Sequence, residues 1–345
     1  MSEQRQALID RDAWDTMSPS RRNDIRRQRK NSRRTRQVRK LVLFLAVAAV
    51  SAAVVVVWTN SSIFARETEL TFTDASLGTI TVQNEVGQMD DDSSEIFDTP
   101  VQLDTLLDTG VLHLVNREHA VSGMPLREDM SDALPSVAVA NQSIGLHPDA
   151  LAAVVGLFDS GESAGFGPFH VASGFRDRMM QAMLYEQIAD SSLVQPPGHS
   201  EHHTGLAVDI VPTALVQEAG GLSEQLDGTS ADERWLADNS WRYGLILRYP
   251  PGTQDITGIT FEPWHFRYVG QPHAWYMWYH ELTLEEYLQQ LRVGGGYDVA
   301  VGDLSYFVRW SAAEGGVVHV PSDEEFSVSG DNVGGYIITA TRAAE

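Results

Sequence analysis

Two short stretches of this sequence combine histidines and carboxylates at spacings that suit metal chemistry. The first, Gly198–Ile210, reads GHSEHHTGLAVDI. Alternating apolar residues over Leu206–Val211 predict a strand, which leaves Asp209 as a carboxylate among apolar neighbours. Such a carboxylate needs a partner, because an unpaired buried charge is costly. Gly205 permits a turn that brings a preceding imidazole toward it, so the stretch predicts a metal site.

The second stretch, Phe261–Tyr268, supplies another imidazole at His265 and another carboxylate at Glu262. Two histidines and one carboxylate form a ligand set of catalytic zinc, which keeps a position for water and lowers the pKa of that water. The remaining carboxylate, Glu262, is then free to take the proton of the water. In a straight strand residues 262 and 265 would point to opposite faces, so we expect Pro263 to introduce a turn.

A third segment, upstream of both, places an arginine where two elements meet. The pattern predicts a strand over His170–Arg176 with a turn at Gly174, followed by a helix over Asp177–Ile188. The guanidinium of Arg176 has the geometry to grip a carboxylate or an oxyanion at two points; a surface ion pair is the alternative. The apolar side of the helix is expected to pack in the core, and it consists of Met179, Met180, Met183, Leu184 and Ile188.

These segments resemble the VanY-type D-alanyl-D-alanine carboxypeptidases, a zinc peptidase family related to the D,D-dipeptidases and L,D-carboxypeptidases. The shared patterns are Ser-x-x-Arg-x-x-x-x-Gln from Ser173, Ser-x-His-x-x-Gly-x-Ala-x-Asp from Ser200, and Glu-x-Trp-His from Glu262. The resemblance covers Val115–Leu291. It implies an α+β fold like that of Hedgehog and D,D-peptidase domains, in which a small antiparallel sheet bears the ligands and helices pack behind it.

The resemblance also implies the cofactor and its ligands. The cofactor is Zn2+, and the ligands are His202, Asp209 and His265. Because His199 and His203 lie beside His202 in the sequence, the choice among these three histidines depends on the family pattern.

Further residues take their roles from the same resemblance. Glu262 is the general base, and Arg176 binds substrate or stabilises the developing oxyanion. Ser173 and Gln181 belong to the substrate pocket. The implied substrate is a peptidoglycan stem peptide that loses its terminal D-alanine, so the implied enzyme is a zinc metallocarboxypeptidase.

The composition limits the ligand chemistry and divides the chain by charge. The 345 residues include no cysteine, so metal ligands must be nitrogen or oxygen atoms. The formal net charge is -22, yet residues 1–40 hold 13 of the 25 Lys and Arg residues and five of the 47 Asp and Glu residues. A basic tail is compatible with nucleic acid, but an adjacent apolar segment favours attraction to anionic lipid. We therefore expect no nucleic-acid partner.

The apolar segment Leu41–Thr59 is uncharged over 19 residues, close to the length at which a helix crosses a bilayer core. Arg39 and Lys40 precede it, so the positive-inside rule places the N-terminus in the cytoplasm. A cleaved signal peptide is the alternative, but the apolar core of a signal peptide is shorter. We expect a single-pass protein of the bacterial cell membrane with an extracytoplasmic catalytic domain.

Five segments are expected along the chain: a basic cytoplasmic tail (1–40), a transmembrane helix (41–59), an acidic stalk (60–104), a zinc peptidase domain (105–292) and a small β-rich appendage (293–345). Within the stalk, Leu70–Val82 has the pattern of a short strand pair. The peptidase domain begins with a strand pattern at Gly110–Arg117, and Gly294–Gly296 marks its end. Thr283 is a predicted N-cap for a helix that continues to Leu291.

Together these features predict a membrane-anchored zinc D-alanyl-D-alanine carboxypeptidase. L,D-carboxypeptidase or D,D-dipeptidase activity on the same stem peptide is the alternative. Pocket depth and the position of Arg176 against the substrate would distinguish the three activities, and neither can be read from the sequence. A noncatalytic wall-binding protein with a structural zinc is a further alternative, although a structural site does not require Glu262. The oligomeric state is left open.

Overall fold

The structure, a computed structural model, describes residues 70–74, 78–84, 96–103, 110–123, 125–133, 144–188, 192–216, 226–301 and 303–343. The basic tail 1–40 and the membrane helix 41–59 lie outside the described residues and stay predictions. Among the helices within the described ranges, none is long and apolar enough to cross a membrane. All described residues belong to one compact unit, Glu67–Glu345.

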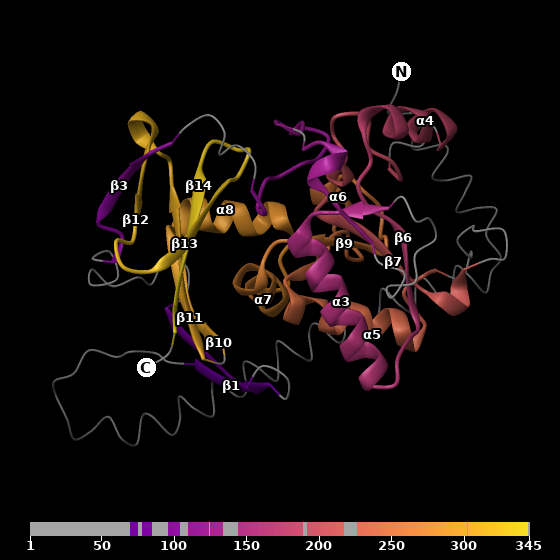
Figure 1. The fold of residues 1–345 in the computed structure, drawn as a ribbon, viewed down its shortest axis with the longest axis horizontal. Coiled ribbons are helices and arrows are strands. Elements are labelled where there is room, and N and C mark those ends of the chain that lie inside the picture. The colour runs from indigo at the N-terminus through magenta and orange to yellow at the C-terminus, as the bar shows by residue number, and fades with distance from the viewer. Residues whose placement is uncertain are drawn as a thin grey trace. The chain divides into compact units, whose positions relative to one another are not determined.

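A four-stranded antiparallel sheet carries two of the predicted ligands (Figure 1). In order across the sheet, its strands are β6 (Phe169–Ser173), β7 (Ala207–Pro212), β9 (His265–Tyr268) and β8 (Leu245–Leu247). The small antiparallel sheet implied by the family resemblance is therefore present. Val208, Ile210 and Phe266 are buried and belong to the hydrophobic core that this sheet shares with a helix.

That helix is α3 (Pro148–Ser163), which packs against the sheet. Pro148 stands in its first turn, where a backbone N–H is not needed, and the His147 side chain accepts a hydrogen bond from the backbone N–H of Asp149. Its buried residues recur at helical spacing and include Ala150, Ala153, Val154 and Leu157. The sheet therefore receives one continuous apolar helix face.

The other helices are α4 (Arg178–Ile188), α5 (Ala231–Asn239), α6 (Gln254–Thr257), α7 (Gln271–His280) and α8 (Leu284–Gly294). Short 3-10 turns occur at η3 (Arg127–Asp129), η5 (Glu201–Thr204), η6 (Thr213–Leu215), η7 (Ser240–Tyr243) and η8 (Glu314–Gly316). The strand β4 (Ser131–Asp132) pairs with β5 (Gly145–Leu146). Helix α8 begins at Thr283, as predicted, and Thr283 and Glu286 cap each other's backbone N–H groups.

A six-stranded sheet has the strand order β1-β2-β10-β11-β14-β13. Its strands are β1 (Leu70–Asp74), β2 (Gly78–Asn84), β10 (Gly296–Val301), β11 (Leu304–Ser311), β13 (Glu325–Gly330) and β14 (Tyr336–Ala343). Separately, β3 (Thr99–Gln102) pairs with β12 (Val317–Val320). The strand pair expected within the stalk is thus formed, and segments 60–104 and 293–345 share two sheets. The domain boundaries near 104 and 293 stay predictions. They are inferred from composition, which carries no information on this pairing of strands.

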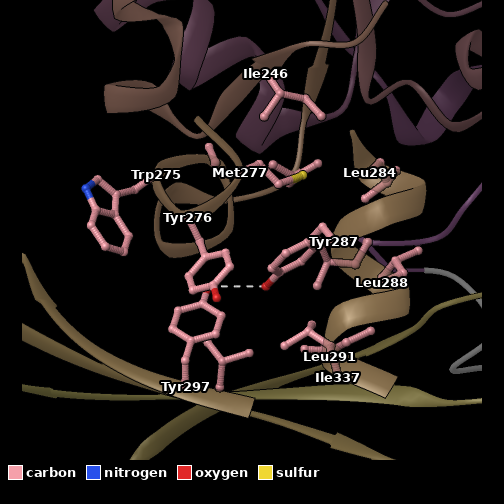
Figure 2. Packing of buried hydrophobic residues seen from close by; sticks show 14 of the residues in the cluster. Ile246, Trp275, Tyr276, Met277, Leu284, Tyr287, Leu288, Leu291, Tyr297 and Ile337 are labelled. Atoms are coloured by element: carbon pink, nitrogen blue, oxygen red, sulfur yellow. Dashed lines mark hydrogen bonds between the residues drawn. The ribbon is translucent and has the colours of Figure 1, made fainter. Parts of the chain in front are cut away.

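The second hydrophobic core lies between α7, α8 and the six-stranded sheet (Figure 2). In Figure 2, Tyr276 of α7, Tyr287 of α8 and Tyr297 of β10 point toward one another. The ring centroids of Tyr276 and Tyr297 are 4.2 Å apart, and the hydroxyls of Tyr287 and Tyr297 are 3.2 Å apart. The core therefore continues across residue 293.

Helix α4 forms where it was predicted, but the prediction that its methionines pack in the core is wrong. Met179 is 70% exposed and Met183 57% exposed, and Met180 is exposed as well. The buried residue of α4 is Gln181, whose side-chain amide donates a 2.7 Å hydrogen bond to the carbonyl of Gln195. A polar contact, rather than the apolar stripe, therefore decides which face of α4 turns inward.

The strand predicted over Gly110–Arg117 is also wrong. These residues form an irregular segment in which Leu112, Leu114 and Val115 are buried. The carbonyl oxygens of Val111 and His113 accept hydrogen bonds from the side chain of Arg267. Because a side chain satisfies these buried carbonyls, the segment is buried without a neighbouring strand.

Candidate active site

The turn η5 and the strand β7 bring the first two predicted ligands together. η5 ends at Thr204, and the next residue, Gly205, adopts a left-handed conformation with φ 72°. Glycine adopts this conformation without the strain that a side chain would cause. The chain therefore reverses between His202 and β7, and the Nε2 atom of His202 comes within 3.5 Å of the Oδ1 atom of Asp209.

Sheet register supplies the third predicted ligand. Asp209 on β7 and His265 on β9 are direct partners across the antiparallel pair, and directly opposite residues of such a pair have neighbouring side chains. The Nδ1 atom of His265 lies 3.1 Å from Oδ1 of Asp209. One ligand atom from each of His202, Asp209 and His265 lies within 4.8 Å of the others, which is an arrangement that could hold a metal ion.

One imidazole nitrogen indicates that a cation fits this cluster. The Nδ1 atom of His202 is 2.7 Å from the carbonyl oxygen of Gly174, so it carries the proton and leaves the lone pair on Nε2. This Nε2 atom is buried and makes no hydrogen bond among the described residues. A buried acceptor that faces a carboxylate is suited to a bound cation, and nitrogen and oxygen donors are ligands that zinc accepts.

The same contacts separate His202 from its two neighbours. Nδ1 of His203 donates to the carbonyl of Arg176 at 2.6 Å, and Nε2 of His203 accepts from the backbone N–H of Gly198 at 2.9 Å. Nδ1 of His199 lies 2.8 Å from the carbonyl oxygen of Asn116. Both ring nitrogens of His203 are therefore engaged in holding loops, and His202 is the histidine of the three that faces Asp209.

Glu262 reaches the cluster from a turn that precedes β9. Residues 263 and 264 form this turn, so Glu262 and His265 approach each other, with Oε2 of Glu262 3.8 Å from Nδ1 of His265. Burial raises the pKa of Glu262 to about 8, against the opposing charges of His265 and Arg176. A carboxylate that titrates near neutral pH is suited to accepting and returning a proton.

Arg176 and Gln181 line a small cleft at this cluster, together with Val194, His202, Tyr249, Glu262 and His265. The Nε atom of Arg176 is buried and makes no hydrogen bond among the described residues. Burial lowers the pKa of Arg176, and the charges of Asp209 and Glu262 oppose this shift. Ser173 lies opposite Asp209 in the sheet rather than in the cleft lining. The cleft thus offers a cationic donor beside the proposed ligands.

Three buried charged residues complete the site and had no predicted role: Glu201, Arg248 and Arg267. Oε1 of Glu201 accepts hydrogen bonds from Nε of Arg248 at 2.8 Å and from a terminal nitrogen of Arg267 at 3.0 Å. Burial by itself would raise the pKa of Glu201, but the two guanidinium groups lower it well below its usual range. One feature of the sequence could have indicated this cluster: an arginine lies within each of the apolar runs LILRYP and HFRY. An arginine buried in such a run requires a charged partner.

The cluster has strongly shifted acidities in the metal-free protein. Burial lowers the pKa of His202 to about 4, and nearby Arg176 adds to this shift. Burial would also lower the pKa of His265, but the carboxylates of Asp209 and Glu201 raise it to about 9. Both imidazoles in turn lower the pKa of Asp209, although burial opposes this. Asp209 therefore stays ionised, the form in which a carboxylate binds a metal ion, and His265 would release a proton on binding one.

Comparisons with known proteins identify relatives of this chain. Residues 143–271 match the family VanY, D-alanyl-D-alanine carboxypeptidase. A D-alanyl-D-alanine carboxypeptidase of Enterococcus faecium is 34% identical over 176 residues, which are 51% of this chain and 54% of that protein. The putative carboxypeptidase YodJ of Bacillus subtilis (strain 168) is 33% identical over 193 residues, which are 53% of this chain and 68% of that protein. The alignment thus spans about half of the first relative.

The solved structures include a similar fold. The vancomycin-resistance D,D-dipeptidase VanXYg, in complex with a D-Ala-D-Ala phosphinate analogue, superposes with a TM-score of 0.59 at 24% sequence identity. The match covers 71% of this chain and 99% of that chain. At 24% identity this similarity concerns the fold alone. The family relationship is shown by the YodJ alignment, which covers 68% of that protein at 33% identity. This chain belongs to the VanY family of D-alanyl-D-alanine carboxypeptidases.

Proposed function

We propose that this chain is a zinc-dependent D-alanyl-D-alanine carboxypeptidase that removes the terminal D-alanine from peptidoglycan stem peptides. One observation carries the proposal: the cluster of His202, Asp209 and His265 opens to a cleft that also holds Glu262 and the buried, unsatisfied Nε of Arg176. Metal ligands, a proton-transfer group and an anion-binding group are the three parts of a site for metal-assisted hydrolysis of a C-terminal amide.

The proposed metal ligands and Glu262 have different parts in the reaction. A bound zinc ion would supply a Lewis acid and a water of lowered pKa. Glu262 accepts a proton from the attacking water and passes it to the amine that leaves when the amide C–N bond breaks. Burial raises its pKa to about 8, which suits a group that takes up and returns a proton near neutral pH.

Arg176 provides the fixed positive charge of the reaction. Its guanidinium lies in the cleft beside Glu262 and His202, and its backbone N–H donates to the carbonyl of His202 at 3.1 Å. The side chain binds the terminal carboxylate of the peptide or stabilises the negative charge that develops on the attacked carbonyl oxygen. Gln181 closes the same cleft, and its Oε1 atom, without a hydrogen-bond partner among the described residues, is free to accept a substrate N–H.

The decisive experiment is a product analysis by mass spectrometry with pentapeptide and tetrapeptide stems. The full-length protein in detergent, with zinc, is expected to release one D-alanine from the pentapeptide. Glu262→Gln is expected to lower kcat by about 10²–10⁴-fold, the usual contribution of a general acid–base group, and a chelator is expected to abolish turnover. Glu325→Gln changes an exposed carboxylate of β13 and is the matched control.

Other products would change the assignment. Release of D-alanine from the tetrapeptide alone would indicate an L,D-carboxypeptidase, and release of a D-Ala-D-Ala dipeptide would indicate a D,D-dipeptidase. Zinc binding without cleavage of either stem would contradict the enzymatic proposal and favour a wall-binding protein.

We also propose that Leu41–Thr59 anchors the protein in the bacterial cell membrane with the catalytic domain outside. Support comes from the sequence: 19 uncharged residues follow Arg39 and Lys40. After cell lysis, the full-length protein is expected to stay with the membrane fraction through a sodium carbonate wash and to be released by detergent. Recovery in the carbonate supernatant would contradict the anchor.

A further inference from the structure

His265 lies between two carboxylates that face its two ring nitrogens. Nδ1 is 3.1 Å from Asp209, the proposed ligand, whereas Nε2 is 3.4 Å from Oε2 of Glu201. A neutral imidazole carries its proton on one nitrogen and a lone pair on the other. To bind a cation beside Asp209, His265 must therefore carry its proton on Nε2, where Glu201 is the acceptor.

We propose that Glu201, held by Arg248 and Arg267, is a positioning residue that fixes this tautomer and orientation of His265 and thereby raises the metal affinity of the site. The proposal rests on the proposed metal site but not on the identity of the substrate. A histidine ligand that donates its second N–H to a carboxylate is a more basic and better oriented ligand.

The two oxygens of Glu201 have separate tasks. Oε1 takes both guanidinium contacts, from Arg248 at 2.8 Å and Arg267 at 3.0 Å. Oε2 is left for His265. The side chains of all three charged residues are at most 1% exposed, so water is largely excluded as a competitor for either oxygen. This division fixes the direction in which Oε2 points.

The two arginines are themselves anchored by segments that do not belong to the metal cluster. The terminal nitrogens of Arg248 bind both oxygens of Glu285, in the first turn of α8, at 2.9 and 2.7 Å. A terminal nitrogen of Arg267 donates to the carbonyls of Val111 and His113, each at 3.0 Å. Glu201 cannot shift away from His265 without disturbing contacts to two other segments of the fold.

The other histidine ligand is oriented in a different way. Nδ1 of His202 donates to the carbonyl of Gly174, a neutral acceptor, and Nε2 faces Asp209. The two histidines should therefore bind metal through different nitrogens, Nε2 in His202 and Nδ1 in His265. This difference gives the proposed tautomer of His265 a spectroscopic signature, and the zinc affinity of a Glu201 variant then tests the part that Glu201 plays.

The first test uses wild-type protein labelled with ¹⁵N-histidine and loaded with ¹¹³Cd²⁺ in place of zinc. Scalar coupling between ¹¹³Cd and ¹⁵N is expected for one Nε2 and one Nδ1 atom, with the remaining nitrogen of each ring protonated. Coupling to two Nε2 atoms would overturn the proposal. The measurement needs no variant, so it holds even where a substitution prevents folding.

The second test measures zinc affinity by competition with a chromogenic chelator, in the absence of peptide. Glu201→Gln is expected to bind zinc about 10–100-fold more weakly than wild type, the usual loss when such a partner is removed. Glu233→Gln is the matched control, because Glu233 is equally buried but accepts backbone N–H groups of Gly228 and Ser230; its zinc affinity should be unchanged.

The outcomes separate this inference from the proposed function. Folded Glu201→Gln with wild-type zinc affinity would overturn the role of Glu201 and leave the carboxypeptidase proposal intact. Wild-type protein that binds neither zinc nor cadmium would overturn the metal site itself, and with it both proposals. Normal metal binding and coupling without stem-peptide cleavage would support Glu201 and contradict the proposed activity.

Discussion

His265 and His273 are both buried histidines, yet their surroundings shift their pKa values in opposite directions. His265 lies between Asp209 and Glu201, whose carboxylates overcome the effect of burial and raise its pKa to about 9 in the metal-free protein. His273, in the second core, has neutral partners, the hydroxyls of Tyr287 and Thr339. Burial alone lowers the pKa of His273 to about 3. Between these two buried histidines, the carboxylates beside His265 account for the opposite directions of the pKa shifts.

The two regions also differ in what holds their polar groups in place. Around His265, buried guanidinium groups and carboxylates pair with one another, so removing one partner leaves a buried charge less well compensated. Around His273, the hydrogen bonds are neutral, and the aromatic residues of α7, α8 and β10 form the second core (Figure 2). The charged region should therefore lose more stability than the neutral region when a single partner is removed.

The largest expected effect is that of Arg267→Met, which removes one counter-charge of Glu201 and the donor to two buried carbonyls. Breaking a buried ion pair typically lowers the free energy of unfolding by about 3–5 kcal/mol. Urea unfolding followed by tryptophan fluorescence measures the loss. Arg342→Met is the matched control, because its ion pair with Glu324 is on the surface and is worth about 1 kcal/mol or less. Equal losses in the two variants would contradict the comparison.

The pH dependence of stability tests the neutral region. The pKa of His273 is lower in the folded protein, about 3, than the ordinary value of 6.5 expected after unfolding. The unfolded chain therefore takes up a proton first, so the contribution of His273 is complete above pH 6.5 and declines as the pH falls toward 3. At pH 5 the loss is about 2 kcal/mol, from 1.36 kcal/mol for each unit of pKa difference.

Urea unfolding of wild type and of His273→Gln at pH 7 and pH 5 isolates this contribution. Wild type should lose about 2 kcal/mol more than the variant between the two pH values. The lowered pKa of His280 contributes equally to both proteins and cancels. An identical pH dependence in wild type and variant would mean that His273 is not held neutral by its surroundings.

A smaller effect is expected from Tyr287→Phe. The hydroxyl of Tyr287 is 2.6 Å from Nδ1 of His273 and 3.2 Å from the hydroxyl of Tyr297. Its removal leaves neutral buried groups without a partner, which costs about 1–2 kcal/mol of unfolding free energy. Tyr306→Phe is the control, since the Tyr306 hydroxyl makes one longer, half-buried hydrogen bond to Gln271. A loss as large as that of Arg267→Met would remove the distinction between the regions.

The proposed ligands were accessible from sequence because most of their geometry is local. His202 and Asp209 lie on either side of one glycine turn, whereas the choice of His202 among three neighbouring histidines and its combination with His265 came from the family resemblance. The role proposed for Glu201 could not be predicted from the sequence, although Glu201 stands next to His202. Its partners Arg248 and Arg267 are 47 and 66 residues away, and no short pattern encodes that contact.

The fold shows the same division between local and distant information. The helix start at Thr283 is encoded by its capping residues and was predicted. The pairing of β2 with β10 joins distant parts of the chain, and composition carries no information on it. Gly110–Arg117 has an apolar pattern typical of a strand, but the hydrogen bonds to its carbonyls come from the side chain of Arg267.

Helix α4 is the clearest case in which an apolar stripe gave the wrong face, and it yields the smallest expected effect. Met183 is 57% exposed, and methionine and glutamine have similar helix propensities. Met183→Gln should therefore change the free energy of unfolding by about 0.5 kcal/mol or less. Leu288→Ala, in the second core, should cost about 2–5 kcal/mol. If urea unfolding gave a loss above 2 kcal/mol for Met183→Gln, the methionine face would have to be covered in solution, and the inward role of Gln181 would no longer follow.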